Sequence, residues 1–546
     1  MGRVCEISYS TLMLIHSVVS FTETKWFSGV IGKLWQRSRN WVSLLVFGVV
    51  LVTMVAVRAS VAMYGSTCFS HDGFMVLDGA WRMLNGQRPH VDFNSMIGPV
   101  AYLPTLVGFL FAGNTAAGFG YGQALMGLVL GIWAYVLGSK LYETPRILYA
   151  LCVAAIAISP GQLGLSPFAL TPGATYNRYS YGLLGVLLLE CLSTEAGSEF
   201  VAGLSTGAVL SLLAFTKITA LIVGTMLTIC LAQQRRQTGR RWLGIVAGAA
   251  FAGLPFLFYL HFDLSSVVCD LAVTAGAKHI RFTQLYSLNS IILDAGLGLL
   301  LSYAASALLG QWGWHREARR LYIAGAVVIA ASILLIFGNF QQSELPLLGL
   351  FFLVISQRLF AEHASVASTG QVVRTVVIGA AAIFSAVNIC AAILSLAAGQ
   401  WLSVHSVRAA PRFEAPALRQ FVPVGAETSY TGFVNDGFEL LKRNRRAGET
   451  VMSLDFTNPF SYGLWIPPAP GGSTNLQYKG SFDEKHKVSP AKLFGAADLV
   501  IMPKTFSDDT LQDTVPRIYG PYLQAHFRMV AGSRQWTLYR KVLAGH

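Results

Sequence analysis

The sequence predicts an α-helical polytopic membrane protein with about eleven transmembrane helices and a small C-terminal α/β domain. Three observations predict this class. The 546-residue chain is 53% hydrophobic and only 12% charged, about half the charged fraction of ordinary soluble domains. Its apolar residues gather in runs near the roughly 20 residues that a spanning helix needs. These runs stop after residue 398, where the composition becomes mixed polar and apolar.

Eleven apolar runs predict the spans, with boundaries uncertain by a few residues. A further apolar segment, 98–113, is short, contains Pro99 and Pro104, and ends in Gly113. We expect it to be a helix near the membrane interface and not a twelfth span. The predicted spans are 40–62, 119–139, 146–161, 180–194, 199–215, 218–232, 242–262, 288–311, 321–338, 345–360 and 373–398.

Basic residues between the spans give the orientation, because cytoplasmic loops carry an excess of Lys and Arg. We expect residues 1–39, which are basic, to be a cytoplasmic or interfacial lead and not a cleaved signal. Four of the five loops then predicted inside carry Lys or Arg within them or at their edges, so the net charge of +13 is explained by topology and nucleic-acid binding is not expected. The predicted inside loops are 140–145, 195–198, 233–241, 312–320 and 361–372, and only 195–198 breaks the pattern.

The C-terminal segment, 399–546, predicts a soluble domain on the outer side of the membrane. ETVMSLD (449–455) and ADLVIMPK (497–504) are typical of buried strands, and 435–446 is typical of a helix. Residues 527–541 predict a hairpin that turns near Gly532 and Ser533. No glycine-rich nucleotide-binding motif is found in this segment.

The first external loop, 64–97, concentrates acids and bases at the membrane edge, and its motif resembles that of a known family. The resemblance is to the GT-C superfamily of polytopic glycosyltransferases, of the dolichyl-phosphate-mannose mannosyltransferase and aminoarabinose transferase type. The match is close over about thirty residues and elsewhere covers only the general layout. The matching pieces are Asp72-Gly73, Ala80-Trp81-Arg82, Gly86-Gln87, Pro89, Asp92-Phe93, Gly98-Pro99 and Tyr102.

The resemblance implies a transmembrane catalytic domain, 40–398, that transfers a sugar from a polyprenyl-phosphate donor. It implies a multi-pass protein of the bacterial cytoplasmic membrane, with a periplasmic C-terminal domain and an acceptor that is an envelope glycan, lipid or protein. Stereochemistry would invert in a single displacement. No cofactor or metal is predicted. The chain departs from many relatives at Gly73, where they have a second acid, and at His90, where they have Tyr.

The resemblance and the chemistry together make Asp72 the expected general base. Such a base removes the proton of the attacking hydroxyl, and Asp72 has the family's spacing to the Ala-Trp-Arg piece. Asp72 is alternatively a helix cap. Asp78, six residues later, points away from Asp72 and is expected to have a surface or structural role. Asp92 either positions the acceptor or pairs with Arg82 or Arg88. His71 and His90 are expected on the loop surface.

Cations at the external ends of spans are the expected ligands of the donor phosphate. Ionisable residues at such places often mark function, although they also snorkel to lipid headgroups. Arg178 follows Tyr176 near the fourth span, and Lys217 lies in the turn between the fifth and sixth spans. The segment GAKHIRF (276–282) supplies Lys278, His279 and Arg281, which either close over the donor or are solvated.

Two other functions compete with this hypothesis. A transporter or flippase of a lipid-linked or anionic precursor predicts inverted repeats and charges at the membrane midplane, and neither is found. An oligosaccharide ligase or polymerase also has external loops, but the motif near the N-terminus favours monosaccharide (hexosyl or pentosyl) transfer. The 7 cysteines form no metal-binding pattern, and only Cys68 and Cys269 fall in segments predicted outside, where a bridge between them is possible.

Overall fold

A computed structural model describes residues 25–161, 166–173, 175–192, 198–232, 238–278, 288–311, 315–339, 346–361 and 369–542. The chain divides into two compact units, residues 1–50 and 51–546. In the first unit the described residues form the beginning of helix α2 (Lys25–Val61). The second unit contains the remaining helices and strands and the candidate site.

A helix covers each of the eleven predicted spans, so the prediction of a helical polytopic chain is confirmed. Within the described residues, the helical segments Trp41–Val61, Ala117–Leu137, Gly239–Tyr259 and His315–Phe337 are each long and apolar enough to cross a membrane. Besides α2 the helices are α5 (Ala117–Leu137), α6 (Glu143–Ile158), α7 (Thr175–Leu192), α8 (Glu199–Ala214), α9 (Ile218–Cys230), α10 (Gly239–Tyr259), α12 (Leu288–Gln311), α13 (His315–Asn339), α14 (Pro346–Ala361) and α15 (Thr369–His405).

Glycines allow α8 and α10 to pack with their backbones in contact. A Cβ added to Gly207 would lie 1.9 Å from the carbonyl oxygen of Ile245, and one added to Gly248 would lie 2.0 Å from that of Leu204. Each helix repeats the small residue at four-residue spacing, which is the pattern that brings membrane helices close together. The two pairs are Gly203 with Gly207 and Gly244 with Gly248.

Helices α4 and α11 lie between predicted spans. α4 (Pro99–Ala112) begins at the proline that follows Gly98, and this confirms a helix at the predicted interfacial segment. α11 (Leu264–Ala277) was assigned to a loop from the sequence. Asp263 begins α11, because its Oδ1 accepts the amide proton of Ser266 at 3.1 Å, which is an N-cap bond.

The C-terminal domain contains a four-stranded sheet in the order β3-β4-β6-β5. The sequence-predicted strands, helix and hairpin are all confirmed. β3 pairs with β4 in parallel, and β6 pairs antiparallel with β4 and β5. The elements are α16 (Thr428–Asn444), β3 (Val451–Ser453), α17 (Phe460–Gly463), α18 (Pro490–Phe494), β4 (Leu499–Pro503), α19 (Thr514–His526), β5 (Phe527–Gly532) and β6 (Trp536–Lys541).

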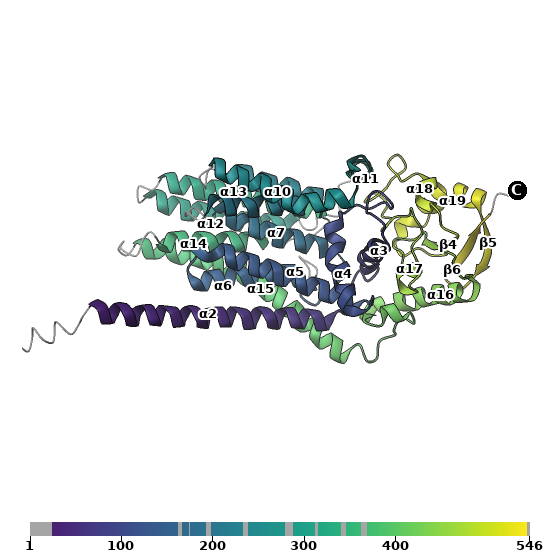
Figure 1. The fold of residues 1–546 in the computed structure, drawn as a ribbon, viewed down its shortest axis with the longest axis horizontal. Coiled ribbons are helices and arrows are strands. Elements are labelled where there is room, and N and C mark those ends of the chain that lie inside the picture. Colours follow the sequence, from purple (N-terminus) through teal and green to yellow (C-terminus); the bar gives the residue numbers. More distant parts are fainter. Residues whose placement is uncertain are drawn as a thin grey trace, which may run out of the picture. The chain divides into compact units, whose positions relative to one another are not determined.

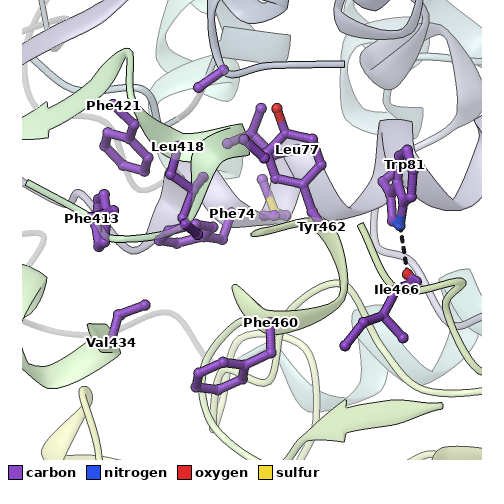
Figure 2. Close-up of a cluster of buried hydrophobic side chains, with 14 of the residues drawn as sticks. Phe74, Leu77, Trp81, Phe413, Leu418, Phe421, Val434, Phe460, Tyr462 and Ile466 are labelled. Atoms are coloured by element: carbon purple, nitrogen blue, oxygen red, sulfur yellow. Dashed lines mark hydrogen bonds between the residues drawn. The ribbon is translucent and has the colours of Figure 1, made fainter. Parts of the chain in front are cut away.

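The first external loop shares a hydrophobic core with the C-terminal domain. Its helix α3 (Asp72–Leu84) lies beside α4, next to the C-terminal domain (Figure 1). The preceding strand β1 (Met63–Ser66) pairs in parallel with β2 (Phe421–Pro423). Figure 2 shows the buried side chains of α3 facing those of the C-terminal domain. The labelled residues of this core are Phe74, Leu77, Trp81, Phe413, Leu418, Phe421, Val434, Phe460, Tyr462 and Ile466.

Candidate functional site

Asp72 lies in the first turn of α3, at the edge of the shared core. Its side chain is 27% exposed, and its Oδ1 lies 3.6 Å from Nε2 of His71. Burial raises the pKa of Asp72, the charge of His71 lowers it and that of Glu427 raises it again. His71 occupies the N-cap position, and no side-chain cap hydrogen bond is made there. Asp72 is therefore the first residue of the helix and not its N-cap.

The C-terminal domain surrounds the residue that precedes Asp72. The ring of Phe456 meets the ring of His71 edge-on with centroids 4.6 Å apart. The hydroxyl of Thr457 donates to the carbonyl oxygen of His71 at 3.1 Å. Asp455 is buried next to them and accepts the hydroxyl proton of Ser507 at 3.0 Å. Burial raises the pKa of Asp455 to about 6.

Segment 455–457 was not identified as part of the site from the sequence, which assigned the C-terminal domain no catalytic residue. Its residues follow strand β3, which ends at Ser453. Polar residues that follow a buried strand are common at functional sites, and this was the signal available in the sequence. Phe456 and Thr457 of the C-terminal domain therefore contact the ring and the carbonyl oxygen of His71, the residue next to the candidate base.

The segment before α7 brings the candidate base close to a cation. A Cβ on Gly173 would lie 2.4 Å from Oδ2 of Asp72. Three residues later, in the first turn of α7, the ring of Tyr176 lies 4.9 Å from Nζ of Lys217. The same Nζ donates to Oδ1 of Asn177 at 3.4 Å. Asp72 and Lys217 thus each contact a residue at or near the start of α7.

Lys217 has a second cation for a neighbour. It is the residue before α9, and Lys278 is the residue after α11. Burial, and then the charge of Lys278, lowers the pKa of Lys217 well below its ordinary value. Burial lowers the pKa of Lys278 as well. Like charges repel, so an anion that contacted both ammonium groups would be stabilised.

Arg178 is buried one turn from the start of α7. Its guanidinium donates to the carbonyl oxygens of Gly161 and of Pro160, the latter at 3.5 Å. These contacts tie α7 to the segment that follows α6. The expectation that Arg178 binds phosphate stays a prediction. The other two predicted ligands, His279 and Arg281, lie outside the described residues.

Asp92 pairs with Arg88, one of the two partners expected from the sequence. The Arg88 guanidinium contacts both carboxylate oxygens, at 2.8 and 3.1 Å, and its backbone amide donates at 2.7 Å. These bonds lower the pKa of Asp92. Asp92 also lines a cavity at the C-terminal end of α3 together with Asn85. Asp72 begins the same helix, so the two acids lie in different places.

Several residues of the loop motif hold the C-terminal domain. Trp81 donates to the carbonyl oxygen of Ile466 at 2.9 Å (Figure 2) and Gln87 to that of Pro468 at 2.7 Å. Arg82 pairs with Asp78 at 2.8 Å and donates to residues 469 and 471. Asp78 is fully buried, so its role is structural and not that of a surface residue.

The surface position expected for His90 is wrong. His90 is buried, with a φ of 70°, and its Nδ1 lies 3.4 Å from Oδ2 of Asp270 on α11. Asp270 also accepts the amide proton of Ser95 at 3.1 Å and pairs with Lys492 of α18 at 3.4 Å. This buried carboxylate therefore joins the first external loop, α11 and the C-terminal domain. The sequence analysis missed it because its partners are far apart in the chain.

Two further sequence questions have structural answers. Cys68 and Cys269 are both free, so the possible bridge between them is not formed. Within the described ranges, no group of three or more His, Cys, Asp or Glu side chains is arranged to hold a metal ion.

Among known proteins, the chain is similar to two solved structures. No protein-family model and no curated protein matches the chain. The crystal structure of ArnT from Cupriavidus metallidurans bound to undecaprenyl phosphate is similar with a TM-score of 0.47 and 14% identity, over 92% of this chain and 98% of that chain. The crystal structure of the same protein in the apo state is similar with a TM-score of 0.44 and 12% identity, over 93% of this chain and 98% of that chain.

Proposed function

We propose that the chain is a membrane glycosyltransferase that moves a sugar from a polyprenyl-phosphate donor to a cell-envelope acceptor. The observation that carries the proposal is that Asp72 lies against Gly173, just before α7, and Lys217 lies against Tyr176 in the first turn of α7. One is a carboxylate with a raised pKa and the other is a cation with a second cation, Lys278, beside it. The motif resemblance of the first external loop supports the same function.

Each group has a defined task in the proposed reaction. Asp72 accepts the proton of the acceptor hydroxyl while the hydroxyl oxygen attacks the anomeric carbon of the donor sugar. The bond between that carbon and the phosphate oxygen breaks, and the electron pair leaves with the polyprenyl phosphate. Lys217 and Lys278 stabilise the phosphate, in a setting where burial strengthens the attraction. A raised pKa suits Asp72 to this task, because a stronger base removes the proton more readily.

Other parts of the proposal follow from the topology of the chain. The active site lies on the periplasmic face, the N-terminus in the cytoplasm and the C-terminal domain, 399–546, in the periplasm. The catalytic domain is 40–398, and the first external loop, 64–97, carries the base. His71 and Thr457 position this base, since Nε2 of His71 lies 3.6 Å from its carboxylate and Thr457 holds the backbone of His71. Arg178, His279 and Arg281 are further candidates for contacts with the donor.

The test follows the consumption of lipid-linked donors. Membranes that contain equal amounts of wild-type protein, Asp72→Asn or the exposed control Asp509→Asn receive a panel of polyprenyl-phosphate sugars. Mass spectrometry then measures each donor. Wild type and Asp509→Asn are expected to deplete one donor, and Asp72→Asn is expected to spare it. Equal depletion by all three would remove Asp72 as the base. Depletion by none of them, with folded protein, would favour a transporter.

A further inference from the structure

A large cavity lies where three parts of the chain meet at the C-terminal end of α3. Its volume is about 680 Å³, within the range of small-molecule sites. The first external loop provides one wall, the turn between α10 and α11 a second, and the proline-rich loop of the C-terminal domain a third. The lining residues used below are Arg88, Asp92, Tyr259, His261 and Pro468.

The walls of this cavity combine apolar surface with polar groups whose charges are balanced. The guanidinium of Arg88 and the carboxylate of Asp92 face each other at 2.8 Å and neutralise one another. The hydroxyl of Tyr259 donates to the carbonyl oxygen of Gln87 at 2.8 Å, which fixes its ring at the cavity. Rings of Pro467, Pro468 and Pro470 add apolar surface. Donors and acceptors without net charge, together with flat apolar faces, suit a neutral polyhydroxylated ligand better than an anion.

The cavity is well separated from the candidate base. Asp72 begins α3 and the cavity lies beyond its end at Leu84. A helix of 13 residues is about 20 Å long at roughly 1.5 Å per residue. A single sugar at Asp72 does not reach the cavity, whereas a chain of several sugars does.

The cavity also lies beside a surface suited to the membrane. Phe258 near the end of α10 and Phe262 in the following turn are 63% and 53% exposed. Leu264 and Val268 continue this apolar surface onto α11. These side chains flank Tyr259 and His261 of the cavity wall. A ligand in the cavity therefore sits next to residues that fit the lipid boundary, as the glycan of a membrane-anchored molecule would.

We propose that this cavity binds neutral sugar residues of the acceptor, several units away from the sugar that reacts at Asp72. The inference rests on the proposed function and narrows it, since the acceptor becomes an oligosaccharide and not a protein or a simple lipid. It gives Asp92 a substrate-binding role separate from the chemistry.

The test measures binding of neutral tetrasaccharides to the purified full-length protein by saturation-transfer NMR. The probes are tetramers of glucose (α- and β-linked), mannose and N-acetylglucosamine, with inorganic phosphate as competitor. The cavity variants are Arg88→Met, Asp92→Asn and Tyr259→Phe. The matched control is Arg443→Met, which removes an exposed Arg paired with Glu439 at the same four-residue spacing, away from the cavity.

We expect at least one tetrasaccharide to bind wild type and Arg443→Met alike, and to bind Arg88→Met and Asp92→Asn at least ten-fold more weakly. Tyr259→Phe, the mildest change, guards against misfolding of the other two and is expected to weaken binding several-fold. Phosphate should not compete. The proposal is overturned if no tetrasaccharide binds, if the cavity variants bind like the control, or if phosphate displaces the sugar.

Failure of this proposal is distinguishable from failure of the proposed function. Asp72→Asn is expected to bind the tetrasaccharide as wild type does, because Asp72 lies outside the cavity. Sugar binding without consumption of any donor would leave the cavity site standing and contradict the transfer reaction. Consumption of a donor without sugar binding would support the transfer reaction and contradict the cavity site.

Discussion

Replacing Arg82 by Met tests whether the loop motif holds the C-terminal domain in place. Arg82 is 1% exposed. It donates to Asp78 at 2.8 Å, to Gln87 at 3.0 Å, and to the carbonyl oxygens of Ala469 and Gly471 at 3.1 and 2.9 Å. Methionine fills much of the same volume but donates no hydrogen bond. The variant leaves the carboxylate of Asp78 buried without its cation.

The expected cost follows from the burial of this pair. Removing one partner of a buried ion pair typically costs about 3–5 kcal/mol, because the remaining charge is uncompensated. Burial raises the pKa of Asp78, and the charge and hydrogen bond of Arg82 lower it. Without Arg82 this pKa is expected to rise further, so the carboxyl becomes protonated more readily. In the double variant Asp78→Leu/Arg82→Met no charge is buried. It is expected to regain most of the loss, as replaced buried pairs often do.

Amide hydrogen exchange gives the readout in the folded protein. The amide of Asn94 donates to Gly472 at 3.0 Å and that of Thr474 to Asn94 at 3.2 Å, both across the junction that Arg82 holds. A loss of about 3–5 kcal/mol predicts roughly a hundred-fold to a few thousand-fold faster exchange at these amides. Arg443→Met is the control and should change nothing. Unchanged exchange in Arg82→Met would refute the reasoning.

Three more predictions concern the candidate site. The pKa of Asp72 is raised in the folded protein, so ionisation of this carboxyl destabilises the fold once the pH rises above the pKa of the unfolded state. Asp72→Asn should therefore unfold at a higher temperature than wild type in a thermal melt at pH 7. The lowered pKa of Lys217 means that its charge is lost as pH rises, so KM for the donor should increase at alkaline pH in wild type and less in Lys217→Arg. His71 lowers the pKa of Asp72, so His71→Gln should move the acid limb of the pH–rate profile to higher pH.

The sequence predicts much of the fold because the relevant signals are local. Apolar runs near the length of a spanning helix predicted all eleven helices. Short apolar segments typical of buried strands predicted β3 and β4. The same reasoning missed α11. Its fourteen residues are too few for a span, and polar residues interrupt its apolar positions. Only the cap at Asp263 marked its start in the sequence.

The candidate site was predicted less completely, because its contacts join distant parts of the chain. Asp72 was proposed as the base from its motif. Arg82 and Gln87 belong to the same motif, but their partners are backbone carbonyls nearly four hundred residues later. Backbone carbonyls that accept such bonds leave little sign in the sequence. The segment 467–470 contains three prolines, which cannot donate a backbone hydrogen bond. Asp270 gave no signal, since its partners come from two distant segments, the first external loop and α18.

The central claim is that Asp72 removes the proton of the acceptor hydroxyl. The most direct test is the single-turnover rate of sugar transfer for wild type and Asp72→Asn, with donor and acceptor both saturating. The account predicts a rate lower by a factor of about 10²–10⁴ in the variant, as expected for loss of a general base, with donor affinity changed little. Equal single-turnover rates would contradict the account.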